Sequence, residues 1–176
     1  EFDNESEPVN KGEIVVTGDV SRDGEGVGMA LAISPSALYV NSREWNILES
    51  RMMFKGKDIS VDGFEMTSGD QLLRVSGRTS TERQDTLALD LGRFDISVLN
   101  AFIGEGLGIK GAATGNVRLV SPIASNSLSG KILCDSTFIA GEPLGELDLS
   151  GCWNEEFERY DLKISNMHDG HSDINA

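Results

Sequence analysis

Apolar and polar side chains alternate in short runs along most of this chain. Met29, Leu31 and Ile33 alternate with small residues, and the same spacing recurs over residues 87–91. Such a period of two places one face of a strand against a core and the other face in water. Gly, Asp, Ser and Asn separate the runs, as in residues 68–70, and these residues favour turns. The pattern predicts an all-β chain of mostly antiparallel strands.

Residues 95–103 depart from this alternation. Their apolar residues Ile96, Leu99 and Ile103 fall at helical spacing, and the segment starts with an aspartate suited to cap a helix. We therefore predict one short helix here, ended by Gly104.

The stretch 43–55 fits two structures. Trp45, Leu48 and Met52 share a face if the stretch is helical, whereas the alternation of Trp45 with Ile47 fits a strand. We favour two strands, because strands are predicted on both sides of the stretch.

The second half of the chain repeats every 15 residues. Gly115, Gly130 and Gly145 each begin a copy of one turn-and-strand pattern, and Tyr160 begins a fourth copy without the glycine. One strand and one connection fill this period, so the copies should pair as an antiparallel meander, a ladder of identical pleats. The side chains predicted to share the inner face include Cys134 and the seven candidate lining residues of an apolar groove, Val117, Leu119, Ile132, Leu147, Leu149, Leu162 and Ile164.

The composition of the chain argues against several classes of function. The 176 residues include 29 acidic and 15 basic side chains, which gives a formal net charge of -14. That charge opposes binding to DNA, RNA or anionic lipid headgroups, all of which need clustered Lys and Arg. No apolar run is long enough for a transmembrane helix. Residues 1–12 are acidic and polar, and we predict a solvated lead-in there, followed by a repetitive β segment of a longer protein over 13–176.

No catalytic or cofactor motif is found in the context that it requires. Residues 106–111 match G-x-G-x-x-G, but that fingerprint needs a strand before it and a helix after it, and the predicted order is reversed. Neither a nucleophile elbow nor a P-loop is present, and no histidine neighbours a candidate nucleophile. We therefore predict no catalytic residue, no cofactor and no enzymatic activity.

Two clusters could in principle hold a metal ion. Residues 19–24 are similar to the start of an EF-hand loop, but Ala30 stands where the loop needs its bidentate acid. His168 and His171 flank an Asp-Gly pair that is typical of a hairpin turn, with Asp173 as one further ligand. A turn is the simpler interpretation of both clusters, and we predict no metal site.

Cys134 and Cys152 are predicted to be free thiols. Cys134 is in phase with Ile132 and should point inward, whereas Cys152 is out of phase with Leu149 and should point outward. A disulfide needs both sulfur atoms on one side of the sheet.

Three parts of the chain carry a resemblance to a known family. They are Ser34-Pro35-Ser36 with Trp45, 71–77 and 85–87; residues 89–100 with 111–117; and residues 144–147 with Trp153-Asn154. A short helix, a G-x-x-x-G strand and G-x-Leu strands follow one another in this order. By these features the chain, from Gly12 to its end, resembles the TamB family of AsmA-like proteins of the Gram-negative envelope, especially the Bacteroidetes-type members.

The resemblance implies a long, curled sheet of the β-taco kind with an apolar inner face. It also implies a full-length protein that is anchored in the inner membrane, spans the periplasm and serves outer-membrane biogenesis. In this family that role involves assembly of outer-membrane proteins with a BamA-like partner, which would contact other parts of the full chain. It also involves movement of phospholipid, whose acyl chains would lie in the groove. The family has no catalytic residues to carry over.

Two other interpretations stay open. A structural or adhesive secreted β-solenoid would seal the same apolar side chains in a core. A carbohydrate-binding β domain would expose Trp45 or Trp153 to stack on sugars. Unpaired strand edges would also favour edge-to-edge self-association.

Overall fold

The structure of the protein is a computed structural model, and it describes most of the chain. The described residues are 2–4, 10–23, 26–40, 42–56, 58–80, 85–100, 107–120, 127–154, 156–157, 159–168 and 171–175. They hold fifteen strands, all in one sheet, and one 3-10 helix, η1 (Ile96–Leu99). The first eight strands are β1 (Phe2–Asn4), β2 (Asn10–Gly12), β3 (Val16–Asp23), β4 (Gly26–Ile33), β5 (Ser36–Val40), β6 (Arg43–Ile47), β7 (Ser50–Lys55) and β8 (Asp58–Ser68). The others are β9 (Gln71–Thr79), β10 (Thr86–Asp95), β11 (Lys110–Val120), β12 (Ser127–Ile139), β13 (Glu142–Asn154), β14 (Arg159–His168) and β15 (His171–Asn175).

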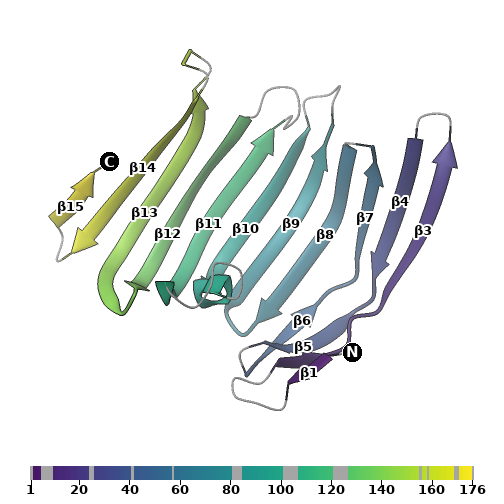
Figure 1. The fold of residues 1–176 in the computed structure, drawn as a ribbon, viewed down its shortest axis with the longest axis horizontal. Coiled ribbons are helices and arrows are strands. Elements are labelled where there is room, and N and C mark those ends of the chain that lie inside the picture. The colour runs from purple at the N-terminus through teal and green to yellow at the C-terminus, as the bar shows by residue number, and fades with distance from the viewer. Residues whose placement is uncertain are drawn as a thin grey trace.

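The sheet consists of one long ladder and a short branch. Ten strands in the order β3-β4-β7-β8-β9-β10-β11-β12-β13-β14 form the ladder, and β15 adds to its far edge (Figure 1). Strand β8 divides its pairing, because Asp58–Asp62 pairs with β7 while Met66 and Thr67 pair with β6. The branch then continues through β5 and β2 to β1. Every pairing among these strands is antiparallel, and the sheet does not close on itself. The prediction of an elongated, curled, antiparallel all-β fold is confirmed.

Two local predictions are also confirmed. Residues 43–55 form the two strands β6 and β7 rather than a helix. The short helix begins where it was expected, as the single 3-10 turn η1, and Oδ1 of Asp95 accepts a hydrogen bond from the backbone N–H of Ser97 at 2.9 Å. The expected end of this helix, at Ile103 and Gly104, lies outside the described residues.

The predicted lead-in over residues 1–12 contains two short strands. β1 and β2 pair with each other, and Lys11 and Gly12 of β2 pair with Tyr39 and Leu38 of β5. Acidic composition gave no sign of this, because the pairing rests on backbone hydrogen bonds and needs no apolar alternation.

The expected ladder of identical pleats is wrong, because the four strands pair antiparallel. The four 15-residue copies do lie in β11–β14 and form the meander. Because neighbouring strands run in opposite directions, Gly115 lies opposite Ile132, and Gly130 lies opposite Gly151 rather than beside Gly145. Two glycines therefore meet on adjacent strands.

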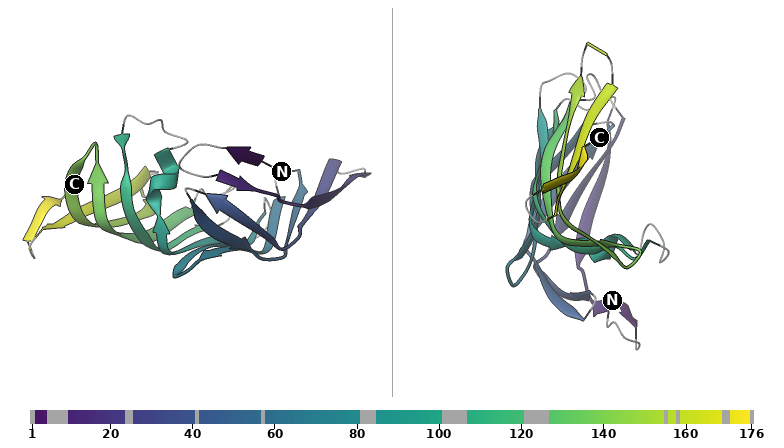
Figure 2. Two further views of the ribbon diagram at one scale, coloured as in Figure 1. Left: turned by 90° about the horizontal axis from the view of Figure 1, so that it is seen from below. Right: turned by 90° about the vertical axis from the view of Figure 1, so that its left-hand side faces the viewer.

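A line of irregular pairing crosses β10, β11 and β12 near one end of these strands. The register is interrupted at Gly92–Arg93, at Gly111 and at Asp135–Ser136, and we call these residues the crease. Arg93 and Ser136 adopt the left-handed conformation, with φ of 45° and 51°. Bulges bend a strand and increase its twist. The sheet accordingly forms a trough, with η1 and the branch on its concave side (Figure 2).

The branch strands and the strand ends beyond the crease enclose a small core. The side chain of Trp45 is 3% exposed, and its ring lies 5.6 Å from the ring of Phe94, centroid to centroid. Leu38 lies opposite Trp45, and both Leu38 and Ile47 are buried. We call Leu38, Trp45, Ile47 and Phe94 the closed corner.

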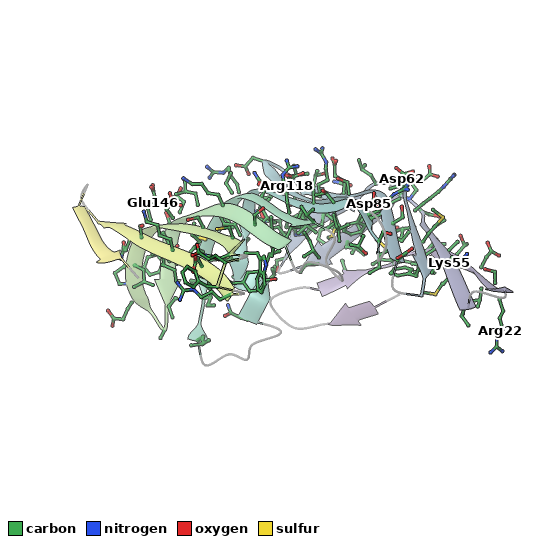
Figure 3. The ribbon with its side chains drawn as sticks, turned by 90° about the horizontal axis from the view of Figure 1, so that it is seen from above. Arg22, Lys55, Asp62, Asp85, Arg118 and Glu146 are labelled. Atoms are coloured by element: carbon green, nitrogen blue, oxygen red, sulfur yellow. The ribbon has the colours of Figure 1, made fainter. Side chains whose placement is uncertain are left out.

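The convex face of the ladder is polar and ion-paired. Arg74 lies opposite Glu65, and its Nη2 atom is 2.7 Å from the Glu65 carboxylate. Figure 3 shows Asp62, Arg118 and Glu146 pointing away from the concave side.

Candidate apolar groove

The concave face of the ladder is apolar across its strands. Residues directly opposite each other in a sheet point to the same side, so rows of inward side chains can be followed through the pairing. One such row runs through Met66, Leu73, Leu91, Gly115, Ile132, Leu149 and Ile164. Together with its neighbouring rows it forms a continuous surface, which we call the inner face.

The paired glycines create a hollow in the inner face. Gly130 and Gly151 lie opposite each other on β12 and β13 and carry no side chains to fill the space between their neighbours. The hollow has a volume of about 270 Å³ and an almost wholly apolar lining. It is lined by Val117, Leu128, Gly130, Ile132, Leu149, Ser150, Gly151, Tyr160, Leu162, Lys163 and Ile164.

The structure places all seven sequence-predicted lining residues on the inner face. Five of them, Val117, Ile132, Leu149, Leu162 and Ile164, line the hollow. Leu119 lies one row beyond it, opposite Leu87 and Leu128. Leu147 lies on the crease side, opposite Cys134 and Asn166.

Sequence reasoning missed the floor and the rim of the hollow. The glycines Gly130 and Gly151 were not recognised as a pair, although their separation of 21 residues places them together once the hairpin between β12 and β13 turns at Ala140 and Gly141. The repeat pattern identifies Tyr160 only as the start of the fourth copy and not as a residue that lines the hollow.

Exposure of the inner face increases toward the far edge of the ladder. Val117, Ile132 and Leu149 are half-buried, whereas Ile164 is 40% exposed and Leu162 is 69% exposed. No second layer covers these side chains within the described residues. The inner face is therefore open to solvent along β12–β14.

Aromatic and polar contacts hold the β13–β14 hairpin at the rim of the hollow. The rings of Trp153 and Tyr160 are 4.8 Å apart in an edge-to-face arrangement. On the outer face of the same hairpin, Nδ2 of Asn154 donates a 2.6 Å hydrogen bond to the Asp161 carboxylate, and Nε of Arg159 lies 2.9 Å from that carboxylate. The Asn154 hydrogen bond and the neighbouring Arg159 charge hold the pKa of Asp161 below its ordinary value of 3.8.

The two cysteines lie on opposite faces, as strand parity predicted. Cys134 is buried on the inner face, opposite Leu147, and Cys152 is exposed on the outer face, opposite Ser129. Both are free thiols, and burial raises the pKa of Cys134 above its ordinary value of 9.0.

The candidate metal and cofactor motifs lie in strands and in the connections between them. His168 pairs with His171 across the hairpin between β14 and β15. Residues 19–23 belong to β3, so the turn expected for residues 19–24 is wrong over 19–23. The part of the 106–111 glycine motif that is described leads directly into β11. Among the described residues, no three His, Cys, Asp or Glu side chains gather where they could hold a metal ion.

Comparisons with known proteins add no assignment. No family model matches the chain, and neither the curated proteins nor the solved structures contain a significant match. In the part of the chain that the structure describes, no helix is long and apolar enough to span a membrane.

Proposed function

We propose that this chain is a non-enzymatic, periplasmic segment of an inner-membrane-anchored protein of outer-membrane biogenesis. Its inner face would carry phospholipid acyl chains along the groove and so supply lipid, or assist outer-membrane protein assembly together with a BamA-like partner bound elsewhere on the full chain. The resemblance to the TamB family suggests this role, and the open inner face is the observation that supports it.

The physical case rests on the continuity of the inner face. An acyl chain loses about 0.8 kcal/mol of unfavourable hydration for each CH₂ group that leaves water. Successive rows across the ladder keep apolar side chains in line, so a chain moving from row to row would stay out of water throughout. Such transport requires no reacting group.

The hollow offers the best-defined place for an acyl chain to rest. Its walls, formed by Ile132, Leu149 and Ile164 among others, are apolar, and its floor consists of glycine backbone. With about 270 Å³, it can take a segment of a hydrocarbon chain and leaves no room for a whole lipid.

The rival interpretations have less support. A sealed β-solenoid would bury the inward side chains, yet Leu162 and Ile164 are exposed. Sugar stacking needs an accessible aromatic face, and Trp45 is 3% exposed in the closed corner. Trp153 already holds an edge-to-face contact with Tyr160.

The proposal can be tested by lipid capture. The chain would be purified from a Gram-negative host, and bound phospholipid would be measured by native mass spectrometry and by extraction. The inner-face variant Ile132→Asn/Leu149→Asn changes two residues that lie opposite each other on β12 and β13. The matched control Ser129→Asn/Leu133→Asn places two asparagines on the outer face of β12 instead.

We expect phospholipid on the wild type and on the control, and its loss from the inner-face variant while circular dichroism stays unchanged. A wild type without phospholipid, or equal amounts on both folded variants, would refute the acyl-chain proposal.

A further inference from the structure

A polar cavity lies at the crease, apart from the hollow of the inner face. Four crease residues, Arg93, Gly111, Asp135 and Ser136, contribute to its lining. The cavity has a volume of about 630 Å³, and its described lining residues are all different from those of the hollow. Bulges often lie next to active sites, where they redirect a side chain. The crease therefore shapes a candidate binding site as well as bending the sheet.

Two side chains of the cavity extend from left-handed backbone. Arg93 and Ser136 have φ of 45° and 51°, which is uncommon for residues other than glycine. The backbone N–H of Arg93 donates a 3.0 Å hydrogen bond to Oγ1 of Thr114, and Nε of Arg93 lies 2.6 Å from Oδ2 of Asp70. Strained conformations that the surrounding structure holds in this way cluster at active sites and ligand clamps.

Charged side chains of both signs line the cavity. Three cations and three carboxylates do so among the described residues: Arg43, Arg93, Lys110, Asp70, Asp95 and Asp135. Arg93 and Asp70 pair with each other. Arg43 and Lys110 have no ion-pair partner in the described part of the chain, although carboxylates line the same cavity. The cavity thus holds charges of both signs that do not reach each other.

A buried amide adds one more hydrogen-bond donor. Gln71 is 5% exposed and lines the cavity. Its Oε1 atom accepts a 3.0 Å hydrogen bond from the backbone N–H of Asp95, and this contact fixes the orientation of the amide. Nε2 of Gln71 has no hydrogen-bond partner within the described residues. A buried amide that lacks a partner is unfavourable, and a bound acceptor would remove that cost.

The donors around the cavity suit a phosphate group. Arg43, Arg93 and Lys110 face it from three different strands, and Gln71 supplies the amide donor. A phosphate group presents strong acceptor oxygens in several directions, whereas a carboxylate has only two oxygens in one plane. Arginine forks and lysine ammonium groups are the usual partners of phosphate oxygens.

The opposite charges of the cavity suit an ammonium group. Oδ1 of Asp135 accepts a 3.1 Å hydrogen bond from Oγ of Ser136, which leaves Oδ2 to accept one from a ligand. Phe138 lines the same cavity on β12, and the face of an aromatic ring attracts a cation. A purely anionic ligand would leave Asp135 unpaired, and the net charge of -14 would repel it.

We propose that this cavity binds a zwitterion in which a short linker joins a phosphate ester to an ammonium group. The phosphate lies among Arg43, Arg93 and Lys110, and the ammonium lies against Asp135 and Phe138. This inference does not depend on what the inner face binds. The same chemistry occurs in free O-phosphoethanolamine and in the headgroup of phosphatidylethanolamine, and the experiment separates these two sources.

An NMR titration tests the ligand class. Backbone amide resonances of the purified chain would be followed while O-phosphoethanolamine, inorganic phosphate or ethanolamine is added. We expect shifts at the crease amides, and an affinity for O-phosphoethanolamine at least about tenfold higher than for either of the other two molecules. The reason is that only the zwitterion pairs with both sets of charges.

Charge removal tests the two ends of the ligand separately. Lys110→Gln should weaken the binding of O-phosphoethanolamine and of phosphate alike, by roughly tenfold. Asp135→Asn should weaken only the binding of O-phosphoethanolamine. Both side chains are exposed, so the fold should be kept, and Arg43→Gln replaces Lys110→Gln if circular dichroism shows unfolding. The control Arg118→Gln removes a cation from the same strand as Lys110 but outside the cavity, and it should leave the affinity unchanged.

Vesicle flotation identifies the source of the zwitterion. The chain would be mixed with vesicles of equal parts phosphatidylethanolamine and phosphatidylcholine. Flotation that is lost both in Lys110→Gln and in the presence of excess O-phosphoethanolamine would identify the lipid headgroup. Binding in the NMR titration without such flotation would identify the free zwitterion.

Three results would overturn the proposal. One is the absence of shifts at the crease amides with O-phosphoethanolamine at millimolar concentration. Another is equal affinity for phosphate and O-phosphoethanolamine, which would exclude the ammonium end. The third is an equal loss of affinity in Lys110→Gln and Arg118→Gln, which would mean that only the overall charge matters.

Discussion

The closed corner and the far half of the ladder are built from the same alternating pattern but end in opposite states. In the closed corner, Trp45 and Leu38 are buried because branch strand β6 lies against the strand ends beyond the crease. In β14, at the far end of the ladder, Leu162 and Ile164 follow the same alternation, yet both side chains remain exposed. Alternation therefore determines which side a residue faces, and a second layer determines whether that side is buried.

Within one sheet, the buried residues that stabilise the fold are therefore different residues from the exposed ones that we propose to bind an acyl chain. Truncating a residue of the closed corner should cost the most free energy of unfolding, because Leu38, Trp45 and Ile47 are buried. The exposed residues of the inner face, such as Leu162, should contribute less to stability, and the proposed acyl-chain binding would depend on them.

The largest effect is expected from truncation in the closed corner. Trp45→Ala removes a nearly fully buried aromatic side chain and should lower the free energy of unfolding by about 3–5 kcal/mol. Leu162→Ala, on the open inner face, should change it by under about 1 kcal/mol. Urea unfolding monitored by circular dichroism measures both. Equal losses for the two variants would contradict the division of the sheet.

Two glycines provide the next comparison. Gly77 has a φ of 104°, and a Cβ there would collide with the carbonyl oxygen of Thr86, so Gly77→Ala should cost about 2–3 kcal/mol. At Gly151 the nearest atom to such a Cβ is Cδ2 of Leu162 at 2.8 Å, which belongs to an exposed, flexible side chain. Gly151→Ala should therefore stay within about 0.5 kcal/mol of the wild type in thermal unfolding.

The reactivity of the two cysteine thiols tests how far the buried region extends along β12. In the native protein at about pH 8, a thiol reagent should modify Cys152 at least about 100-fold faster than Cys134, because Cys134 is buried and remains protonated. Rapid modification of Cys134 would mean that the inner face is open at its position too.

Alkaline pH gives a further readout of Cys134. Its raised pKa means that the unfolded chain loses the thiol proton first, so stability falls as the pH rises above the ordinary value of 9.0. Urea midpoints at about pH 8 and pH 10 should differ less in Cys134→Ala than in the wild type.

The smallest effect is expected on the outer face of the β13–β14 hairpin. Asn154→Ala removes the hydrogen bond that contributes most to the low pKa of Asp161, so that pKa should rise toward its ordinary value of 3.8. Because the folded-state pKa is depressed, the associated stabilisation is lost as the pH falls through that pKa. An NMR titration of the carboxyl group measures the shift, and an unchanged pKa would exclude Asn154 as its main cause.

The sequence predicted the faces of the sheet better than its shape. Strand parity placed Leu149 and Ile164 on one side and Cys152 on the other, because successive side chains in a strand must alternate. The meander of β11–β14 followed from the 15-residue repeat.

Features that depend on register or on long-range contacts could not be predicted in this way. The Gly130–Gly151 pair depends on where the hairpin turns. The 15-residue repeat does not reveal it, because neighbouring copies run in opposite directions. Arg93 and Ser136 adopt positive φ without being glycine, so the crease has no local signal. The burial of Trp45 depends on Phe94, which lies far away along the chain.

The width and the length of the trough depend on different features of the chain. The position of the bulge along each strand sets the width, and the number of strands sets the length. Duplicating one hairpin together with its bulges would lengthen the trough and leave its cross-section unchanged. A sheet of this architecture can therefore change its length by gaining or losing pairs of strands, while the width of the trough stays the same.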